Sequence, residues 1–157
     1  MTVTTDTHVF FLRNHFSNFT MCNIMVDGIK FSNTEQAFMY FKALQFKDFE
    51  TAKQILKESN PVEAKKLGRL VKNFKNSEWE EVRYGVMLNV NIPKYNLPTF
   101  KQFLLATKDK ILVECNPRDP VWGIGLSEED PRVHDTHLWQ GQNLLGKVLM
   151  EIRSTLQ

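Results

Sequence analysis

The chain has 157 residues, of which 42% are hydrophobic and 24% are charged. This length supplies one domain with a substantial core and is too short for two ordinary domains, so we expect a single domain over residues 1–157. Twenty basic residues against eighteen acidic ones give a formal net charge of only +2, which excludes a large basic field for non-specific capture of nucleic acid. This net charge does not exclude binding of a small charged ligand.

The cysteines and the N-terminal segment indicate the compartment. Cys22 and Cys115 are the only thiols, they form no C-x-x-C motif, and the many phenylalanines can build a core without cross-links. The first residues lack the charged start and apolar run of a signal peptide, and no apolar run approaches the length of a membrane span. We therefore expect a cytoplasmic protein that does not enter a membrane.

The first third of the chain predicts short strands and a buried helix. A β-favouring run at 8–12 predicts a strand, and a second run that reaches the tight-turn dipeptide Asp27-Gly28 predicts a small hairpin. Ser32 is followed three residues later by Glu35, which is capping-box spacing for a helix over about 34–46. Apolar residues lie nearly all round this helix, so we expect it to be buried.

The middle of the chain predicts three more helices. The first covers about 48–58. Asn60, with proline directly after it, supplies a cap and a first-turn proline for the second, which we expect to end near Val71. Ser77 has the position of a cap for the third, in which apolar residues recur at three- and four-residue spacing until Pro93 closes the helix.

The last third combines helices, one strand and a long irregular segment. We expect a helix over 99–107, a short buried strand over 111–114 and a final amphipathic helix from Asn143 onward, in which Gly146 allows a neighbour to approach closely. Between the strand and this helix, residues 115–142 show no clear secondary structure. Such long loops are usually functional or disordered, and a segment with two tryptophans argues against disorder.

Glu35 and Lys42 are the strongest clue to a functional site. They lie seven residues apart, and at about 100° per residue this spacing puts both side chains on one face of the predicted helix. Because an ionised group buried without a partner is costly, buried charges are usually paired, hydrogen-bonded or functional. From the helix alone, a structural ion pair is an equally good interpretation. A capping role for Glu35 would compete with a role in a site.

The long segment holds further candidates for ligand binding. Asp119, Trp122 and Gly123, with Trp139 further on, combine a carboxylate, large flat apolar surfaces and flexible backbone. This combination suits a pocket that stacks a ring and lets backbone approach a ligand. Each residue also has a structural interpretation, because the tryptophans can fill the core and an aspartate before proline can form a turn.

Three residues are candidates for binding phosphate. Arg69 and Arg83 present guanidinium groups whose paired donors match phosphate oxygens, and Asn143 stands at a helix N-terminus, which attracts anions. Taken singly, such arginines are more often solvated, and such an asparagine is more often a cap. The histidines and cysteines do not fall at ligand spacing on one element, so we predict no metal.

Several motifs follow one another along nearly the whole chain: Phe16-Ser-Asn-Phe19, Glu35-x6-Lys42, Gly68-Arg69, Trp79-x2-Val-Arg83-x3-Met87, Asp119-x2-Trp-Gly-x-Gly125 and Trp139-x-Gly-x-Asn-x2-Gly146. In their order and spacing they resemble the NADAR superfamily, the YbiA-like N-glycosidases. Several blocks in one order are far more specific than any single block.

The resemblance implies a mainly α fold of the α+β kind, a compact helical domain with a few short strands. It also implies an enzyme without a cofactor, an N-glycosidase that hydrolyses the ribosyl C–N bond of a phosphorylated ribosyl-base substrate. ADP-ribosylated guanine and a phosphoribosylamino-pyrimidine intermediate of riboflavin synthesis are such substrates, and ADP-ribosylated nucleic acid is a third form. The alternative is a noncatalytic module that binds ADP-ribose or NAD.

The resemblance also assigns roles to residues. In the family pattern the positions of Glu35, Lys42 and Asp119 belong to the active site, and all three groups are present here. The chain departs from some members at Gln36, where they carry histidine, and in its longer loop at 126–138. We expect substrate contacts from Trp122, Gly123, Arg69, Arg83, Asn143, Trp139 and Phe19.

Overall fold

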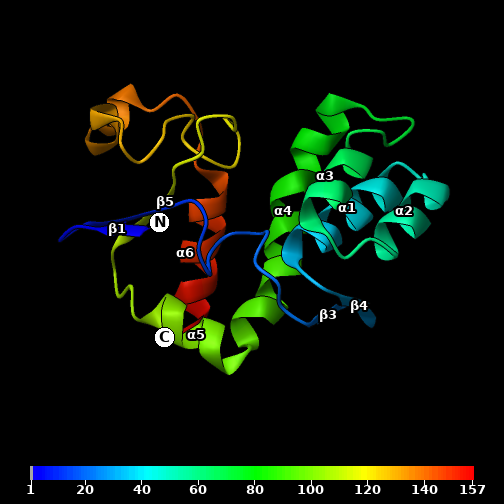
Figure 1. Cartoon of the computed structure of the whole chain (residues 1–157), viewed down its shortest axis with the longest axis horizontal. Helices are drawn as coiled ribbons and strands as arrows, with labels where there is room; N and C mark the ends of the chain where they lie inside the picture. The colour runs from blue at the N-terminus through cyan, green and yellow to red at the C-terminus, as the bar shows by residue number, and fades with distance from the viewer. Residues whose placement is uncertain (1) are drawn as a thin grey trace. The chain divides into compact units, whose positions relative to one another are not determined.

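The computed structural model describes residues 2–157, and their contacts divide the chain into two compact units. A central unit comprises Asn18–Leu97, and a terminal unit comprises the residues up to Ser17 together with those from Pro98 onward. Over the described residues, helices dominate and the strands are few and short, as Figure 1 shows. The predicted mainly helical α+β class is therefore confirmed. A single domain over 1–157 stays a prediction, and each unit is described by itself.

The central unit consists of a hairpin followed by four helices. Its elements are β3 (Ile24–Val26), β4 (Ile29–Phe31), α1 (Thr34–Gln45), α2 (Phe49–Leu56), α3 (Pro61–Gly68) and α4 (Asn76–Asn96). The two strands pair antiparallel, and Asp27 and Gly28 between them have positive φ angles of 50° and 80°. Positive φ at both central residues is the geometry of a tight hairpin turn, so the predicted hairpin is confirmed.

Helix α1 is the core element of the central unit. It packs against α2, α3 and α4 (Figure 1), and its residues 34–39 are all buried. Such burial on every side follows from a helix that carries apolar residues nearly all round. The prediction of a buried helix at this place is confirmed.

The N-terminus of α1 differs from the prediction in a way that affects Glu35. The N-cap is Asn33, whose Oδ1 accepts a hydrogen bond from the Gln36 N–H at 2.8 Å. Gln36 Oε1 in turn accepts from the Ser32 N–H at 2.7 Å. The capping pair thus lies one residue further along than Ser32 and Glu35, because the amide side chains reach the orphan N–H groups. The Glu35 carboxylate is not the capping partner that the spacing predicted.

Helix α4 differs from the prediction at both ends. It begins at Asn76 after Lys75, which makes no side-chain cap, and it continues past Pro93 to Asn96. A proline inside a helix costs about 3 kcal/mol because it removes a donor and crowds the preceding turn. Burial of the next two residues, Lys94 and Tyr95, accompanies this continuation. Like the other helices of residues 2–157, α4 is not apolar enough over a sufficient length to cross a membrane.

The terminal unit combines a three-stranded sheet with helices. Its elements are β1 (Thr2–Thr4), β2 (His8–Phe11), α5 (Pro98–Leu105), β5 (Ile111–Glu114), two 3-10 helices at Pro131–His134 and Thr136–Leu138, and α6 (Leu144–Leu156). In the sheet, β2 lies between β1, which is antiparallel to it, and β5, which is parallel. The predicted strands β2 and β5 and the predicted helices α5 and α6 are confirmed. Strand β1 is exposed, which explains why no apolar pattern predicted it.

Gly146 in α6 lies directly against β5. A Cβ atom at this position would overlap the Leu112 carbonyl oxygen and the Asn143 side chain, so the predicted close approach is confirmed. We expect Gly146→Ala to lower the free energy of unfolding by about 1 to 3 kcal/mol, because a backbone carbonyl cannot move aside easily. Gly85 in α4 has no such neighbour within 4 Å. There we expect Gly85→Ala to raise stability by about 0.5 to 1 kcal/mol.

Urea denaturation of the two variants beside the wild type measures both effects. Equal effects of the two substitutions would contradict the role given to the contact between α6 and β5.

Candidate functional site

Glu35 and Lys42 carry opposite charges at the two ends of α1. Glu35 lies in the first turn with only 6% of its surface exposed, and Lys42 lies half-buried in the last turn. The pKa of the Lys42 ammonium is lowered, and burial is the main cause. The Glu35 carboxylate opposes this change, whereas the Arg69 guanidinium adds to it. Glu35 and Arg69 therefore both lie within electrostatic reach of Lys42. All three residues are among those that the sequence singles out.

Arg69 reaches this place because α3 packs tightly on α1. A Cβ atom on Gly68, the last residue of α3, would overlap the Met39 side chain of α1, so Met39 would have to move to accept any larger residue here. Arg69 follows directly as the C-cap of α3, and its side chain is exposed. The Gly-Arg step thus delivers an exposed guanidinium within electrostatic reach of Lys42.

Two partly exposed phenylalanine rings carry lysines on their faces. The Lys42 Nζ atom lies 4.8 Å from the centroid of the Phe74 ring, and the Lys65 Nζ atom lies 5.6 Å from that of Phe19. Phe74 is 41% exposed and Phe19 is 37% exposed. At such distances the ring face attracts the cation. Sequence reasoning missed Phe74, because it stands in no motif and its pairing with Lys42 joins α1 to the segment between α3 and α4. It treated Lys65 as a surface charge.

Arg83 does not join this group. It lies half-buried on α4, and over the described part of the chain it is not among the charges that act on Lys42. A phosphate-binding role for Arg83 stays a prediction.

In the terminal unit, Asp119 shapes the loop that carries Trp122. Its Oδ1 atom accepts hydrogen bonds from the Val121 and Trp122 N–H groups, both at 2.9 Å. A side chain that accepts from backbone two and three residues on forms a local turn. Asp119 therefore has the turn-forming role that was one of its two interpretations. A part for Asp119 and Trp122 in chemistry stays a prediction.

Gly123 and Trp139 have structural roles in the same loop. A Cβ on Gly123 would meet the Glu114 carbonyl oxygen at 2.9 Å, so this glycine packs against backbone. Trp139 packs on the core cluster that includes Phe10 and Ile124, and its Nε1–H donates to the Val133 carbonyl oxygen at 2.9 Å. These contacts explain why the two residue types are needed, and substrate contacts from them stay predictions.

Asn143 begins α6 as predicted, but its side chain does not cap the helix. The residue is buried with a φ of 54°, its Oδ1 accepts from the Glu114 N–H, and its Nδ2 donates to the Leu112 carbonyl oxygen. The N–H groups of residues 143, 144 and 145 donate to carbonyl oxygens of residues 123, 121 and 122. These three N–H groups at the start of the helix therefore already bind the preceding loop. A substrate-binding role for Asn143 stays a prediction.

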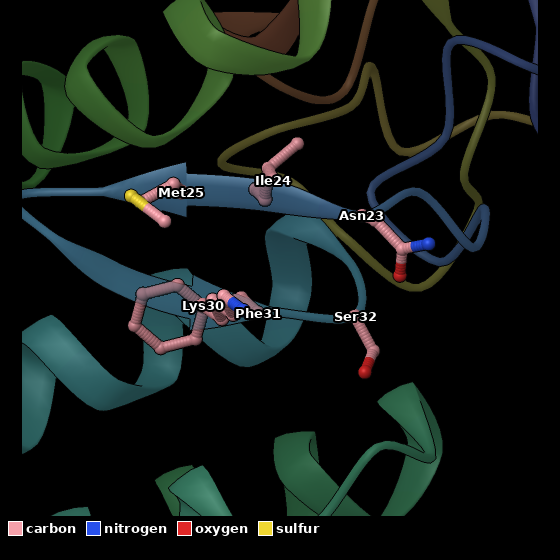
Figure 2. A pocket seen from close by; sticks show the side chains of 6 residues that line it. All are labelled: Asn23, Ile24, Met25, Lys30, Phe31 and Ser32. Carbon is pink, nitrogen blue, oxygen red and sulfur yellow. The ribbon is translucent and has the colours of Figure 1, made fainter.

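A surface pocket of about 430 Å³ lies elsewhere in the central unit, on the hairpin (Figure 2). The side chains that line it are Asn23, Ile24, Met25, Lys30, Phe31 and Ser32. Lys30 is the one ionisable group among them, and no predicted site residue lines the pocket. The hairpin pocket therefore offers no acid for the chemistry that the sequence implies.

The chain is similar to several known proteins. The chain is 40% identical to Protein irg-1 of Caenorhabditis elegans over 131 residues. This matched region is 82% of this chain and 62% of that protein. It is 37% identical to N-glycosidase R617 of Acanthamoeba polyphaga mimivirus over 129 residues. This matched region is 82% of this chain and 76% of the relative. Riboflavin biosynthesis protein VVA0006 of Vibrio vulnificus is 32% identical over 92% of this chain, which spans only 36% of that relative.

The structural comparison agrees with these relatives. The NMR structure of the Escherichia coli protein YbiA matches with a TM-score of 0.77 and 31% identity, over 98% of this chain and 87% of that one. The model of the NADAR domain family matches residues 4–157, which is nearly the full length. The chain therefore belongs to the NADAR domain family.

Proposed function

We propose that this chain is an N-glycosidase that hydrolyses the ribosyl C–N bond of a phosphorylated ribosyl-base substrate. The observation that carries the proposal is the burial of Glu35 on the helix that also carries Lys42, whose charge responds to both Glu35 and Arg69. Relatives named N-glycosidases, from a virus and from bacteria, support the reaction class. The name of the Vibrio relative supports a link with riboflavin intermediates.

A buried carboxylate suits the chemistry of this bond. Cleavage builds positive, oxocarbenium-like charge on the ribose as the base leaves, and a nearby carboxylate stabilises that charge or deprotonates the attacking water. Such an interaction is stronger where water is excluded, because the effective dielectric constant is lower. Glu35 is 6% exposed, so it meets this condition. In this proposal Lys42 supports the negative charge of Glu35 and binds a ribose hydroxyl or a phosphate.

The surroundings of Glu35 suit a substrate with phosphate and a flat base. Glu35, Lys42 and Arg69 together carry a net charge of +1, and the exposed guanidinium of Arg69 can bind phosphate oxygens in pairs. The partly exposed ring of Phe19 offers a face for stacking. ADP-ribosylated guanine and a phosphoribosylamino-pyrimidine combine these features. Two free, buried cysteines fit a reducing compartment, so we place the activity in the cytoplasm.

A substrate panel tests this function. The purified protein is incubated with ADP-ribosylated guanosine, a phosphoribosylamino-pyrimidine and NAD, and the released base is measured by chromatography. We expect base release from at least one of the first two compounds. Calorimetric binding of ADP-ribose or NAD without release from any compound would instead identify a noncatalytic binding module. Absence of both binding and release would exclude a ribosyl-phosphate site.

A further inference from the structure

Phe74 lies outside every motif, and 41% of the residue is exposed. Its ring is nevertheless held in place by neighbouring side chains. The ring packs edge-to-face on Phe46, with centroids 5.2 Å apart and planes at 62°. Phe46 is the buried C-cap residue of α1, and it also contacts Trp79 of α4. Aromatic pairs at such distances and angles are favourable beyond the area that they bury. The position of Phe74 is therefore tied to the end of the helix that carries Lys42.

The backbone that leads to Phe74 is also anchored. Asp48 caps α2, and its Oδ1 accepts from the Thr51 N–H at 3.1 Å. Its Oδ2 accepts from the Lys72 N–H at 2.9 Å, two residues before Phe74. These bonds lower the pKa of the Asp48 carboxyl, the bond from Lys72 having the largest effect. One buried carboxylate therefore joins the start of α2 to the segment between α3 and α4.

The fixed ring meets the one lysine of α1. The Lys42 Nζ atom lies 4.8 Å from the ring centroid, on the face where the electron density of the ring attracts a cation. Half-burial removes water from the ammonium, and the charged groups that act on it are Glu35 of the same helix and Arg69 at the end of α3. Burial and Arg69 disfavour the charged amine, whereas Glu35 and the ring favour it.

We propose that Phe74 is a positioning residue for Lys42. The Phe74 ring holds the Lys42 side chain as a charged ammonium on the Glu35 side of α1. The inference rests on the proposed function in so far as it gives Lys42 a part in the reaction. It adds a residue to the site that neither the motifs nor the spacing of charges indicates. A ring that only covered the core would present no face to the cation and would not affect its charge.

The first test measures Lys42 in the free protein, without any substrate. NMR titration of isotope-labelled lysine side chains follows Lys42 in the wild type, in Phe74→Leu and in Phe74→Trp. Leucine keeps an apolar contact with Phe46 but removes the ring, and we expect the pKa of Lys42 to fall by about half a unit to one unit. Tryptophan keeps a ring face and is expected to retain the wild-type value. Lys42→Arg identifies the Lys42 signal.

Phe49 supplies the matched control. It is 60% exposed at the start of α2 in the same unit, so Phe49→Leu makes the same chemical change at a ring other than the one that Lys42 faces. This variant is expected to leave the pKa of Lys42 unchanged. Should Phe74→Leu not fold, as judged by thermal melting, Phe74→Met replaces it. An unchanged pKa of Lys42 in a folded variant that lacks the ring would overturn the proposal, as would an equal fall in the Phe49 control.

Kinetics give a second readout that separates positioning from folding. On a substrate that the wild type cleaves, we expect Phe74→Leu to lower kcat by about 3- to 10-fold with a smaller change in KM, and Phe74→Trp to restore kcat. If the wild type cleaves nothing in the panel, the proposed function fails, while the titration still decides whether Phe74 controls Lys42. A loss of kcat that tryptophan does not restore would overturn the positioning role.

Discussion

Glu35→Gln is expected to lower the rate of base release by about 10²- to 10⁴-fold, which is the usual contribution of one general acid or base. Glutamine has nearly the same shape, so it keeps the packing around a residue that is 6% exposed. It cannot carry the negative charge that stabilises an oxocarbenium-like ribose or take a proton from water. The expected loss is therefore chemical and not structural.

The fold is expected to tolerate this change because the capping bonds of α1 come from other side chains. Asn33 and Gln36 make the two capping bonds, and the Glu35 backbone N–H donates to the Asn18 carbonyl oxygen at 3.1 Å in wild type and variant alike. Single-turnover chromatography measures base release, and thermal melting checks folding. The pKa of Lys42 provides a third readout, since the loss of the Glu35 charge should lower it further.

Glu63→Gln is the matched control for this experiment. Glu63 lies on α3 in the same unit, 48% of its side chain is exposed, and it pairs with Lys66 across one helical turn at 3.1 Å. An exposed pair of this kind contributes little to stability, so the control is expected to retain activity and fold. Near-normal base release by Glu35→Gln on every substrate of the wild type would show that Glu35 is not the catalytic carboxylate.

Local patterns predicted much of the fold because their causes are local. The Asp27-Gly28 turn requires two residues that tolerate positive φ, and the sequence offers them at one place between two short β-favouring runs. The all-round apolar character of α1 follows directly from its composition. The close approach at Gly146 likewise follows from the lack of a side chain within an otherwise apolar stripe.

The errors arose where competing local signals were nearly equal. Ser32 and Glu35 have the spacing of a capping box, but so do Asn33 and Gln36 one residue later, and only the structure shows that the second pair makes the bonds. Pro93 normally ends a helix, yet α4 continues to Asn96. Burial of the residues after it is a tertiary effect that the local pattern does not contain.

The site was predictable only in part, for a related reason. The seven-residue spacing of Glu35 and Lys42 is a property of one helix, and it placed both charges on one face without any knowledge of the fold. The approach of Arg69 depends on how α3 packs on α1, and that of Phe74 depends on the path between α3 and α4. Such contacts between distant segments leave no periodic signal.

A second large effect is expected from Lys94, which is fully buried in α4 of the central unit with 0% of its surface exposed. Burial lowers the pKa of its ammonium from 10.5 to about 8, and the nearby Cys22 thiol raises it only in part. The Nζ atom lies 5.3 Å from the centroid of the Tyr95 ring. Charged Lys94 therefore destabilises the folded state relative to the unfolded chain at neutral pH.

The pH dependence of this effect follows from proton binding. Below pH 8 the lysine is charged in both states, and a difference between 10.5 and about 8 corresponds to a penalty of about 3 kcal/mol. Between the two values the unfolded chain binds more protons than the folded one, so the free energy of unfolding rises with pH. The pKa values of Cys22, Cys115 and Tyr95 are raised in the folded state. As the pH rises through the pKa values of these groups in the unfolded chain, they make the free energy of unfolding fall.

Lys94→Met separates the lysine from these other groups, because methionine fills similar space without a charge. At pH 7 we expect the variant to have a higher free energy of unfolding than the wild type. Between pH 7 and about 9.5 this difference is expected to shrink by about 2 kcal/mol, because the folded wild type loses the proton of Lys94. Urea denaturation at several pH values measures the difference, with Lys53→Met on the exposed face of α2 as the control. A difference that stays constant over this range would mean that the contacts of Lys94 stabilise its charge enough to offset its burial.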